Sequence, residues 1–298
     1  MAEADLRHNL LEIAPADVEQ WLERTDTVMI PIGSCEKHGD HVPMGTDSYI
    51  TIETVERAAE KADVPYSPLI PVGYSPHHMG ERYREDGDYV VGGGLTLRAS
   101  TLRALIEDLG RSLIYHGFDK LIFVSQHGSN TKVIDEVLRK LRYDTDCFTC
   151  WYKTPTEREI DVVEDIVEGG SDETPGWHAG EMETAMVMAH DEALVKMDRA
   201  NEDSAHAPEW LSDEFTKRDG MPHVEFKGSE NIWIPMEHHE YSDTATIGNP
   251  FRASVEEGES ILERNSAHLA AFANEAETID FTVPEEKREF DFRAMGGE

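Results

Sequence analysis

Cysteine is scarce in this sequence, with 3 residues in a chain of 298. So few cysteines, and an odd number, cannot form the disulfide framework that stabilises small secreted domains, so we expect the chain to work in a reducing, cytoplasmic compartment. Cys147 and Cys150 have the spacing of a redox or zinc pair, but no second pair accompanies them. We therefore expect these two side chains to pack along a strand.

Basic residues are also scarce, because 27 Lys and Arg stand against 61 Asp and Glu and the formal charge is −34. Such a chain repels nucleic acids and anionic membrane surfaces, so we expect neither as a partner. The acidic residues are spread through every segment. This indicates the solvated acidic surface of a halophilic protein, whose self-repulsion is screened in a high-salt cytoplasm. The alternative is a protein with one acidic interaction face.

Long hydrophobic runs are absent, and the first residues lack a basic start followed by an apolar core. We therefore expect neither a membrane span nor a signal peptide. Hydrophobic residues still make up 39% of the chain, which is enough for a globular core. We find no repeat of fixed period and no convincing linker, so we predict one domain over residues 1–298 with a peripheral tail from about residue 279.

Hydrophobic runs alternate with amphipathic stretches along the chain. Strands are predicted at 27–32, 66–72, 120–125 and 146–152. Helices are predicted at 50–62, 102–113 and 133–141, from 154 to 167, near 179–189, and from 255 onwards. This alternation predicts a three-layer α/β/α sandwich with a mainly parallel sheet. The stretches 81–94 and 201–227 predict irregular structure, the first as a loop over the site.

Potential metal ligands follow the first predicted strand. Glu36 and His38 are two residues apart, so on an extended segment their side chains leave the same face. Asp47 follows where a helix begins, and a carboxylate can bridge two ions. One such residue alone is more often a hydrogen-bonding loop residue. The combination at the carboxyl end of a strand predicts a metal site.

This stretch, from Gly33 to Asp47, resembles the first motif of the creatininase family of metal-dependent amidohydrolases, Gly-Ser-x-Glu-x-His-Gly-x-His-x-Pro-x-x-Thr-Asp. Residues 126–130 resemble the family's Asn-Gly-His-Gly-Gly-Asn turn, and residues 178–184 resemble its His-Ala-Gly-x-x-Glu-Thr motif. The resemblance implies a creatininase-like fold and an enzyme that hydrolyses a C–N bond in a cyclic amide or formamide with metal-activated water.

The resemblance also implies the site residues. One or two divalent ions (Zn, Mn or Fe) are expected, with Asp47 as the bridge, and ligand type leaves the metal open. His178 is expected to act as the catalytic acid for the leaving nitrogen, and its alternative role is to orient a carboxylate. The full set of implied metal ligands is Glu36, His38, Asp47, His127 and Glu183.

One position departs from the family pattern. Enzymes that act on creatinine carry an acidic ligand two residues after the His of the second motif, and here that position is Ser129. A creatinine-specific site is therefore not expected. Glu183 is expected to complete the shell of the second ion instead, and its alternative role is to interact with a helix N-terminus.

Four residues are predicted to contact a small-molecule substrate. His78 lies in a loop where the family places a histidine near the substrate, with a plain surface histidine as the alternative. Asn130 is carried over from the second motif as a positioning residue. Trp151 and Trp177 are predicted to wall a flat, cyclic substrate, with core packing as the alternative. The resemblance further implies a homo-oligomer, commonly a hexamer.

Other functions stay open. The family includes a formamidopyrimidine deformylase, a mycofactocin-maturation peptidase and hydrolases of cyclic inositol-derived ketones. A non-catalytic metal-binding or assembly protein with the same fold is a further alternative, which a closed metal site without an open coordination position would favour. A phosphate-binding nucleotide enzyme ranks last, because no Gly-rich loop follows the first predicted strand.

Overall fold

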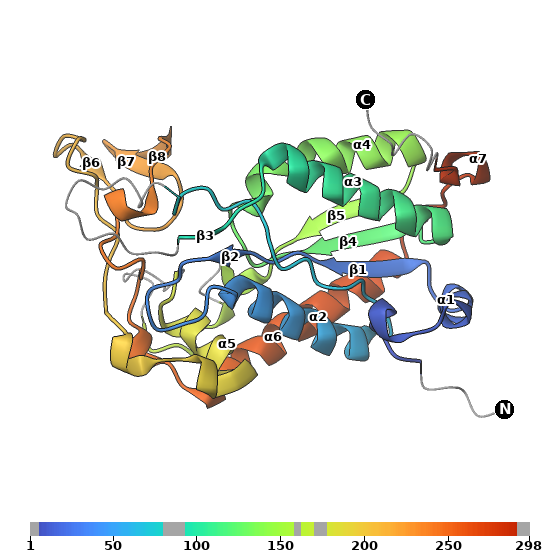
Figure 1. Cartoon of the computed structure of the whole chain (residues 1–298), viewed down its shortest axis with the longest axis horizontal. Coiled ribbons are helices and arrows are strands. Elements are labelled where there is room, and N and C mark those ends of the chain that lie inside the picture. Colours follow the sequence, from blue (N-terminus) through green and yellow to red (C-terminus); the bar gives the residue numbers. More distant parts are fainter. Residues whose placement is uncertain (1–5, 80–92, 158–161, 170–177, 291–298) are drawn as a thin grey trace.

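A parallel sheet of three strands forms the centre of the molecule (Figure 1). The computed structural model describes residues 6–79, 93–157, 162–169 and 178–290. The strands lie in the order β1-β4-β5 and pair in parallel throughout. Their bounds are β1 (Thr27–Pro31), β4 (Lys120–Val124) and β5 (Phe148–Tyr152).

Helices cover both faces of this sheet (Figure 1). On one face Ile30 of β1 packs with residues of α3 and α4, and on the other Met29 packs with residues of α2 and α6. Strands buried on both faces carry hydrophobic residues without alternation, as the sequence has them. The predicted three-layer α/β fold with a parallel sheet is confirmed. The helices are α1 (Pro15–Leu22), α2 (Thr46–Ala62), α3 (Ala99–His116), α4 (Asp135–Thr145), α5 (Glu181–Asp191), α6 (Val255–Glu277) and α7 (Glu285–Arg288).

The chain leaves β1 through a close approach to α2. A Cβ on Gly33 would lie 2.6 Å from the Cα of Ser48, so no larger residue fits there. The Ser48 hydroxyl donates to the Ser34 carbonyl oxygen over 2.8 Å, which holds the turn against the helix. Strand β2 (Cys35–Glu36) then pairs antiparallel with β3 (Gly94–Leu95). The segment that carries Glu36 therefore lies just beyond the carboxyl end of the parallel sheet.

The strand predicted at 66–72 is wrong. This segment runs parallel to β1 but pairs with it only at isolated points, where Tyr66 meets Met29 and Ile70 meets Ile32. Prolines 65, 68 and 71 lack the N–H groups that a continuous ladder needs.

The helix predicted from residue 154 to 167 is not formed in the described part. Pro155–Glu157 make one 3₁₀ turn, and residues 162–169 form turns and bends. The hydroxyl of Thr154, the first residue of this segment, donates to the side-chain oxygen of Gln126, so it does not cap a helix. Residues 158–161, and most of the predicted loop at 81–94, lie outside the described residues.

A small antiparallel sheet occupies part of the region predicted as irregular. It contains short strands and a turn in which Lys227 and Gly228 have φ of 51° and 82°, as tight hairpins require. Val224 is buried beneath it with Tyr241 and Ile247. The strands are β6 (Phe215–Thr216), β7 (His223–Phe226) and β8 (Ser229–Trp233).

The tail beyond α6 packs on the molecule up to α7. Val283 belongs to the core between the sheet, α3 and α4. Arg288 binds the Asp119 carboxylate over 2.5 Å and the Ile114 carbonyl oxygen over 3.1 Å. Among the described residues, no helix is long and apolar enough to cross a membrane.

Candidate metal centre

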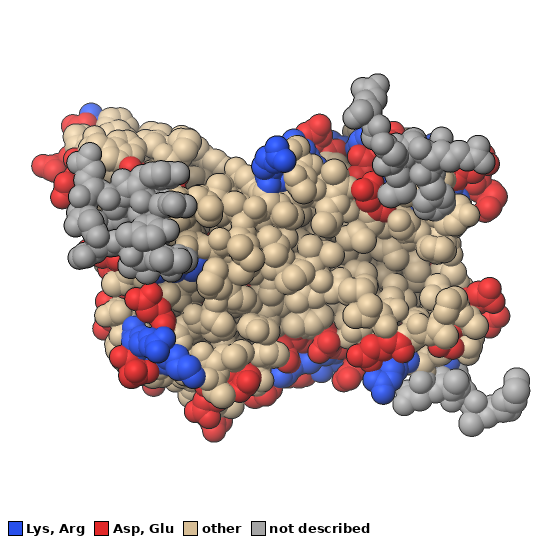
Figure 2. Space-filling model, viewed as in Figure 1, with Lys and Arg blue, Asp and Glu red and all other residues tan. Residues whose placement is uncertain are grey.

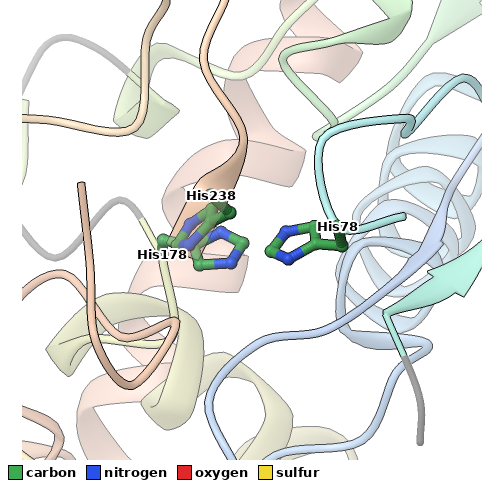
Figure 3. A group of neighbouring side chains, drawn as sticks. All are labelled: His78, His178 and His238. Atoms are coloured by element: carbon green, nitrogen blue, oxygen red, sulfur yellow. The ribbon is translucent and has the colours of Figure 1, made fainter. Parts of the chain in front are cut away.

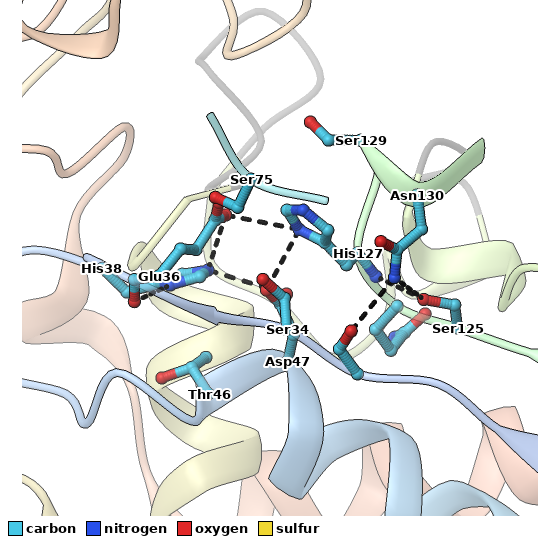
Figure 4. A network of polar contacts seen from close by, with 12 residues as sticks. Ser34, Glu36, His38, Thr46, Asp47, Ser75, Ser125, His127, Ser129 and Asn130 are labelled. Atoms are coloured by element: carbon cyan, nitrogen blue, oxygen red, sulfur yellow. Dashed lines mark hydrogen bonds and ion pairs between the residues drawn. The ribbon is translucent and has the colours of Figure 1, made fainter. Parts of the chain in front are cut away.

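Five side chains meet beyond the carboxyl ends of β1 and β4. Figure 4 shows four of them, Glu36, His38, Asp47 and His127. All five come from the positions that the sequence predicts as metal ligands. Four are buried, with exposed fractions between 1% and 4%, and the fifth, Glu183, is partly buried. The sources are β2 for Glu36, the following loop for His38, the first turn of α2 for Asp47, the loop after β4 for His127 and the first turn of α5 for Glu183.

Asp47 lies between two groups of these side chains. Its Oδ2 is 3.1 Å from Nδ1 of His127, and its Oδ1 is 3.6 Å from Nε2 of His38. Glu36 Oε1 is 3.4 Å from the same His127 nitrogen, and Glu183 Oε2 is 3.7 Å from the same His38 nitrogen. Two triads that share Asp47 result, each with its ligand atoms within 4.8 Å of one another: Glu36, Asp47 and His127, and His38, Asp47 and Glu183.

Backbone carbonyl groups set the orientation of both imidazoles. Nε2 of His127 lies 2.9 Å from the Tyr74 carbonyl oxygen, and Nδ1 of His38 lies 3.2 Å from the Glu36 carbonyl oxygen. A carbonyl oxygen only accepts, so these nitrogens carry the protons in neutral rings. The other nitrogens then present lone pairs towards the carboxylates. Lone pairs facing carboxylate oxygens repel unless a cation lies between them, so this donor set fits divalent ions.

The pKa shifts of these side chains come from their burial and from the charges packed around them. Burial alone would raise the pKa of Glu36, but the charge and hydrogen bond of His127, together with the charges of His38 and His78, outweigh it and lower the pKa well below its usual value. Burial raises the pKa of Glu183 to about 8. For His38, burial opposes the charged form, yet Asp47 and Glu183 raise its pKa. Three carboxylates so close in a buried site require a positive charge among them.

Two further groups hold the carboxylates. The Ser75 hydroxyl donates to Oε2 of Glu36, and the Ala179 N–H donates to Oε2 of Glu183 over 2.6 Å. Sequence reasoning missed Ser75, whose only signal is its place two residues before the His77-His78 pair. Such outer contacts orient metal-binding carboxylates.

His178 lies beside the two triads with a fixed ring. Its Nε2 lies 2.8 Å from the Lys37 carbonyl oxygen, so Nδ1 carries the lone pair in the neutral ring and lies 3.9 Å from Oε1 of Glu36. The ring stacks on His38 with centroids 4.1 Å apart. Burial and the charge of His38 lower the pKa of His178 well below its usual value, which favours the neutral ring. His178 therefore offers a basic nitrogen to the cavity.

A cavity extends from the triads and is lined by His77, His78 and Ser129 among others. Ser129, at the family's acidic ligand position, contacts Nε2 of His77 over 2.6 Å and Nζ of Lys132 over 3.3 Å. Burial lowers the pKa of His77 to about 3, which favours the neutral ring. Among the described residues that line the cavity, Lys132 is the only Lys or Arg.

The predicted substrate contacts differ in their placement. His78 is buried and lines the cavity. Asn130 is not part of the lining, because its amide bonds to Tyr74 N–H, the Gly33 carbonyl oxygen and the Ser125 hydroxyl and so ties three loops together. Trp151 packs at the edge of the core cluster, away from the cavity lining. Trp177 lies outside the described residues.

Sequence reasoning also missed His238, which lines the cavity from the 3₁₀ turn His238–Glu240. Its signal in the sequence is a His-His pair between two glutamates. No hydrophobic strand precedes it, so the pattern that led to the predicted ligands does not apply. Tyr241 follows and lines the same wall, with its ring centroid 4.7 Å from that of His238.

Known proteins share this sequence pattern. The creatininase family model, described as creatinine amidohydrolase, matches residues 12–273. Creatinine amidohydrolase of Pseudomonas putida is 28% identical over 187 residues, which cover 58% of this chain and 67% of that protein. Mycofactocin precursor peptide peptidase of Mycobacterium tuberculosis is 26% identical over 262 residues, which cover 84% of this chain and 86% of that protein. The 3-dehydro-scyllo-inosose hydrolase of Thermotoga maritima is 26% identical over 178 residues, which cover 58% of this chain and 52% of that protein.

Solved structures share the fold. A creatininase in its Mn form has a TM-score of 0.69 at 23% identity and covers 91% of this chain and 99% of its own. A creatinine amidohydrolase homologue from Bacteroides fragilis has a TM-score of 0.69 at 22% identity and covers 93% of this chain and 98% of its own. The family model spans most of the chain. The chain belongs to the creatininase family of metal-dependent hydrolases.

Proposed function

We propose that this protein hydrolyses a C–N bond in a cyclic amide or formamide, using one or two divalent ions held by the two triads. The observation that carries the proposal is the position of Asp47, whose two oxygens face two different groups of ligands. Creatininases are known in an Mn form and in a Zn-Zn form, which supports either metal here. Iron suits the same ligand types.

The ions would lower the pKa of a water molecule and polarise the carbonyl oxygen of the substrate. The protein's own contribution is proton transfer by His178. Its Nε2 is held by the Lys37 carbonyl oxygen, so Nδ1 accepts the proton from the attacking water. The same nitrogen then donates that proton to the leaving nitrogen, so one residue serves as base and acid. Stacking on His38 fixes the plane in which the ring works.

The substrate is expected to differ from creatinine. Ser129 replaces the acidic residue of creatinine-hydrolysing enzymes, and its hydroxyl is held by His77 rather than by the triads. Glu183 takes the vacant role in the second triad. A hydroxyl and neutral imidazoles offer hydrogen bonds to a polar ring, so a hydroxylated or heterocyclic amide suits this wall.

A substrate screen of the purified protein, loaded in turn with Zn²⁺, Mn²⁺ and Fe²⁺, tests the proposal. The compounds are creatinine, a formamidopyrimidine and an inosose, the last because the inosose hydrolase is a relative. We expect metal-dependent hydrolysis of the formamide. Turnover of the inosose alone would replace the proposal with ring-ketone hydrolysis. Bound metal without turnover, and without an exchangeable water on it, would support a non-catalytic metal-binding or assembly protein.

A further inference from the structure

Three histidines face one another on the wall of the cavity next to the triads (Figure 3). We call His78, His178 and His238 the three-histidine cluster. Their ring centroids lie 4.4 Å apart for His78 and His238, 4.5 Å for His178 and His238, and 5.5 Å for His78 and His178. All three rings are buried, and one ligand nitrogen of each lies within 4.8 Å of the others.

His238 has no hydrogen-bonding partner for its ring. Within the described residues neither Nδ1 nor Nε2 makes a hydrogen bond, although only 2% of the residue is exposed. A buried polar group without a partner is costly, so in the native site a water molecule or a bound ligand satisfies it. The backbone N–H of His238 donates to the His77 carbonyl oxygen over 2.8 Å, which holds the residue beside His78.

The cluster presents lone pairs to the cavity. The Lys37 carbonyl oxygen leaves Nδ1 of His178 as an acceptor. Negative charge is close, because Glu36 Oε2 lies 3.9 Å from Nε2 of His78 and Glu36 Oε1 lies 3.9 Å from Nδ1 of His178. Neutral imidazoles beside a carboxylate suit a borderline cation.

We propose that the three-histidine cluster is a further binding site for a divalent transition-metal ion such as Zn²⁺, separate from the two triads. Tetrahedral zinc with bonds of about 2.0 Å needs nitrogens roughly 3.3 Å apart. Nitrogens as far apart as 4.8 Å must therefore close by about 1.5 Å, which the unbonded ring of His238 permits.

An ion bound by the three-histidine cluster occupies Nδ1 of His178, the atom that the proposed function uses as base. The site is therefore inhibitory.

Metal counting tests the site on the full-length protein. We expect the wild type to take up three Zn²⁺ per chain in equilibrium dialysis, measured by atomic emission. His238→Phe keeps a ring in the same place but removes the ligand nitrogens, so we expect two. His116→Phe, the same change at an exposed residue at the end of α3, should still give three. Asp47→Ala should lose the ions of the triads and retain the third.

Cobalt gives a second readout. The third equivalent of Co²⁺ should produce the visible absorption of a tetrahedral site in the wild type, and His238→Phe and His78→Phe should both lack it. A wild type that saturates at two ions, or a folded His238→Phe protein that binds as many ions as the wild type, would overturn the site. Absence of hydrolysis in the substrate screen would defeat the proposed function but leave this metal count unchanged.

Discussion

Asp47 is the residue on which both predicted ions depend. Each of its oxygens faces a different imidazole, at 3.1 Å and 3.6 Å. Asp47→Ala should therefore lower the content of both ions, measured by atomic emission after dialysis with two equivalents of metal. His178→Gln should bind both ions under the same conditions and lose turnover, by roughly two to four powers of ten for a general acid–base catalyst.

The control is Asp40→Ala, which removes an exposed carboxylate from the loop between Glu36 and Asp47. It should change neither the metal content nor the turnover. An Asp47→Ala protein with its full complement of two ions would contradict the bridging role. A His178→Gln protein that lost both ions would instead make His178 a ligand of the pair.

A second carboxylate, Glu257 of α6, should make stability depend on pH. Burial and the neighbouring charge of Glu181 raise the pKa of Glu257 to about 8, against about 4.3 in an unfolded chain. Between these values the folded state holds more protons than the unfolded state, so this residue makes the free energy of unfolding fall as pH rises. Glu257→Gln should remove that part of the fall. Thermal melts from pH 5 to pH 8.5 at fixed metal concentration measure it.

Glu256→Gln is the matched control, because Glu256 is the preceding, exposed residue of α6. It should leave the slope of melting temperature against pH as in the wild type. Equal slopes for Glu257→Gln and the wild type would show that Glu257 titrates near its ordinary pKa.

The site residues that the sequence predicted are those concentrated in short motifs. Glu36, His38 and Asp47 lie within twelve residues of one another after a buried strand, so one local pattern identifies them. His238 and Ser75 reach the same cavity from irregular segments, and only the tertiary structure brings them there. A tryptophan such as Trp151 cannot be assigned to core or cavity from its type alone, because both environments suit it.

The contact between α5 and α6 positions Glu183 at the candidate metal centre. A Cβ on Gly258 of α6 would lie 2.9 Å from the Met186 backbone nitrogen and overlap the Ala185 carbonyl group of α5. Gly258→Ala should therefore push the helices apart and destabilise the protein by about 1–3 kcal/mol, as overpacking does. Since Glu183 moves with α5, metal affinity should fall too. Chemical unfolding and metal titration measure the two effects.

Ser260→Ala, two residues further on the exposed side of α6, is the control and should change stability by less than about 0.5 kcal/mol. If Gly258→Ala unfolded at the same denaturant concentration as the wild type, the helices would not be in the contact described.

Helices and strands with a clear hydrophobic pattern were predictable from the sequence, and short or proline-interrupted ones were not. Strands β1, β4 and β5 carry continuous hydrophobic runs because both faces are covered. The strands of the antiparallel sheet have two to five residues, and β8 is largely exposed, so neither length nor burial marks them in the sequence. Residues 66–72 have strand composition, but their prolines leave only isolated pairs.

Acidic residues are spread along the whole sequence. Figure 2 shows acidic side chains around the rim of one face and a broad central area without charge. Such an area would let copies of the chain meet without bringing carboxylates together. The homo-oligomer, a hexamer by family resemblance, stays a prediction that sedimentation can test. The halophilic and cytoplasmic setting likewise stays a prediction.

Stability should rise with salt, because the charge is so one-sided. Salt screens both the attraction within ion pairs, which stabilises the fold, and the repulsion among acidic residues, which destabilises it. It weakens exposed ion pairs such as Arg139–Asp135, which stabilise the folded state only slightly because water surrounds them. It also weakens the repulsion among the acids, and 61 acids less 27 bases leave 34 without a matching charge. Repulsion therefore outweighs the pairs.

We expect the melting temperature to increase steadily as KCl rises from about 0.1 M to several molar, while the screening length falls from about 10 Å to below 3 Å. Sucrose at equal osmolality is the control, since it adds no ions and should not reproduce a rise that comes from screening. A variant with several exposed glutamates changed to glutamine should show a shallower rise. A melting temperature that stayed flat or fell with KCl would mean that the acids are paired or far apart, and would remove the halophilic interpretation.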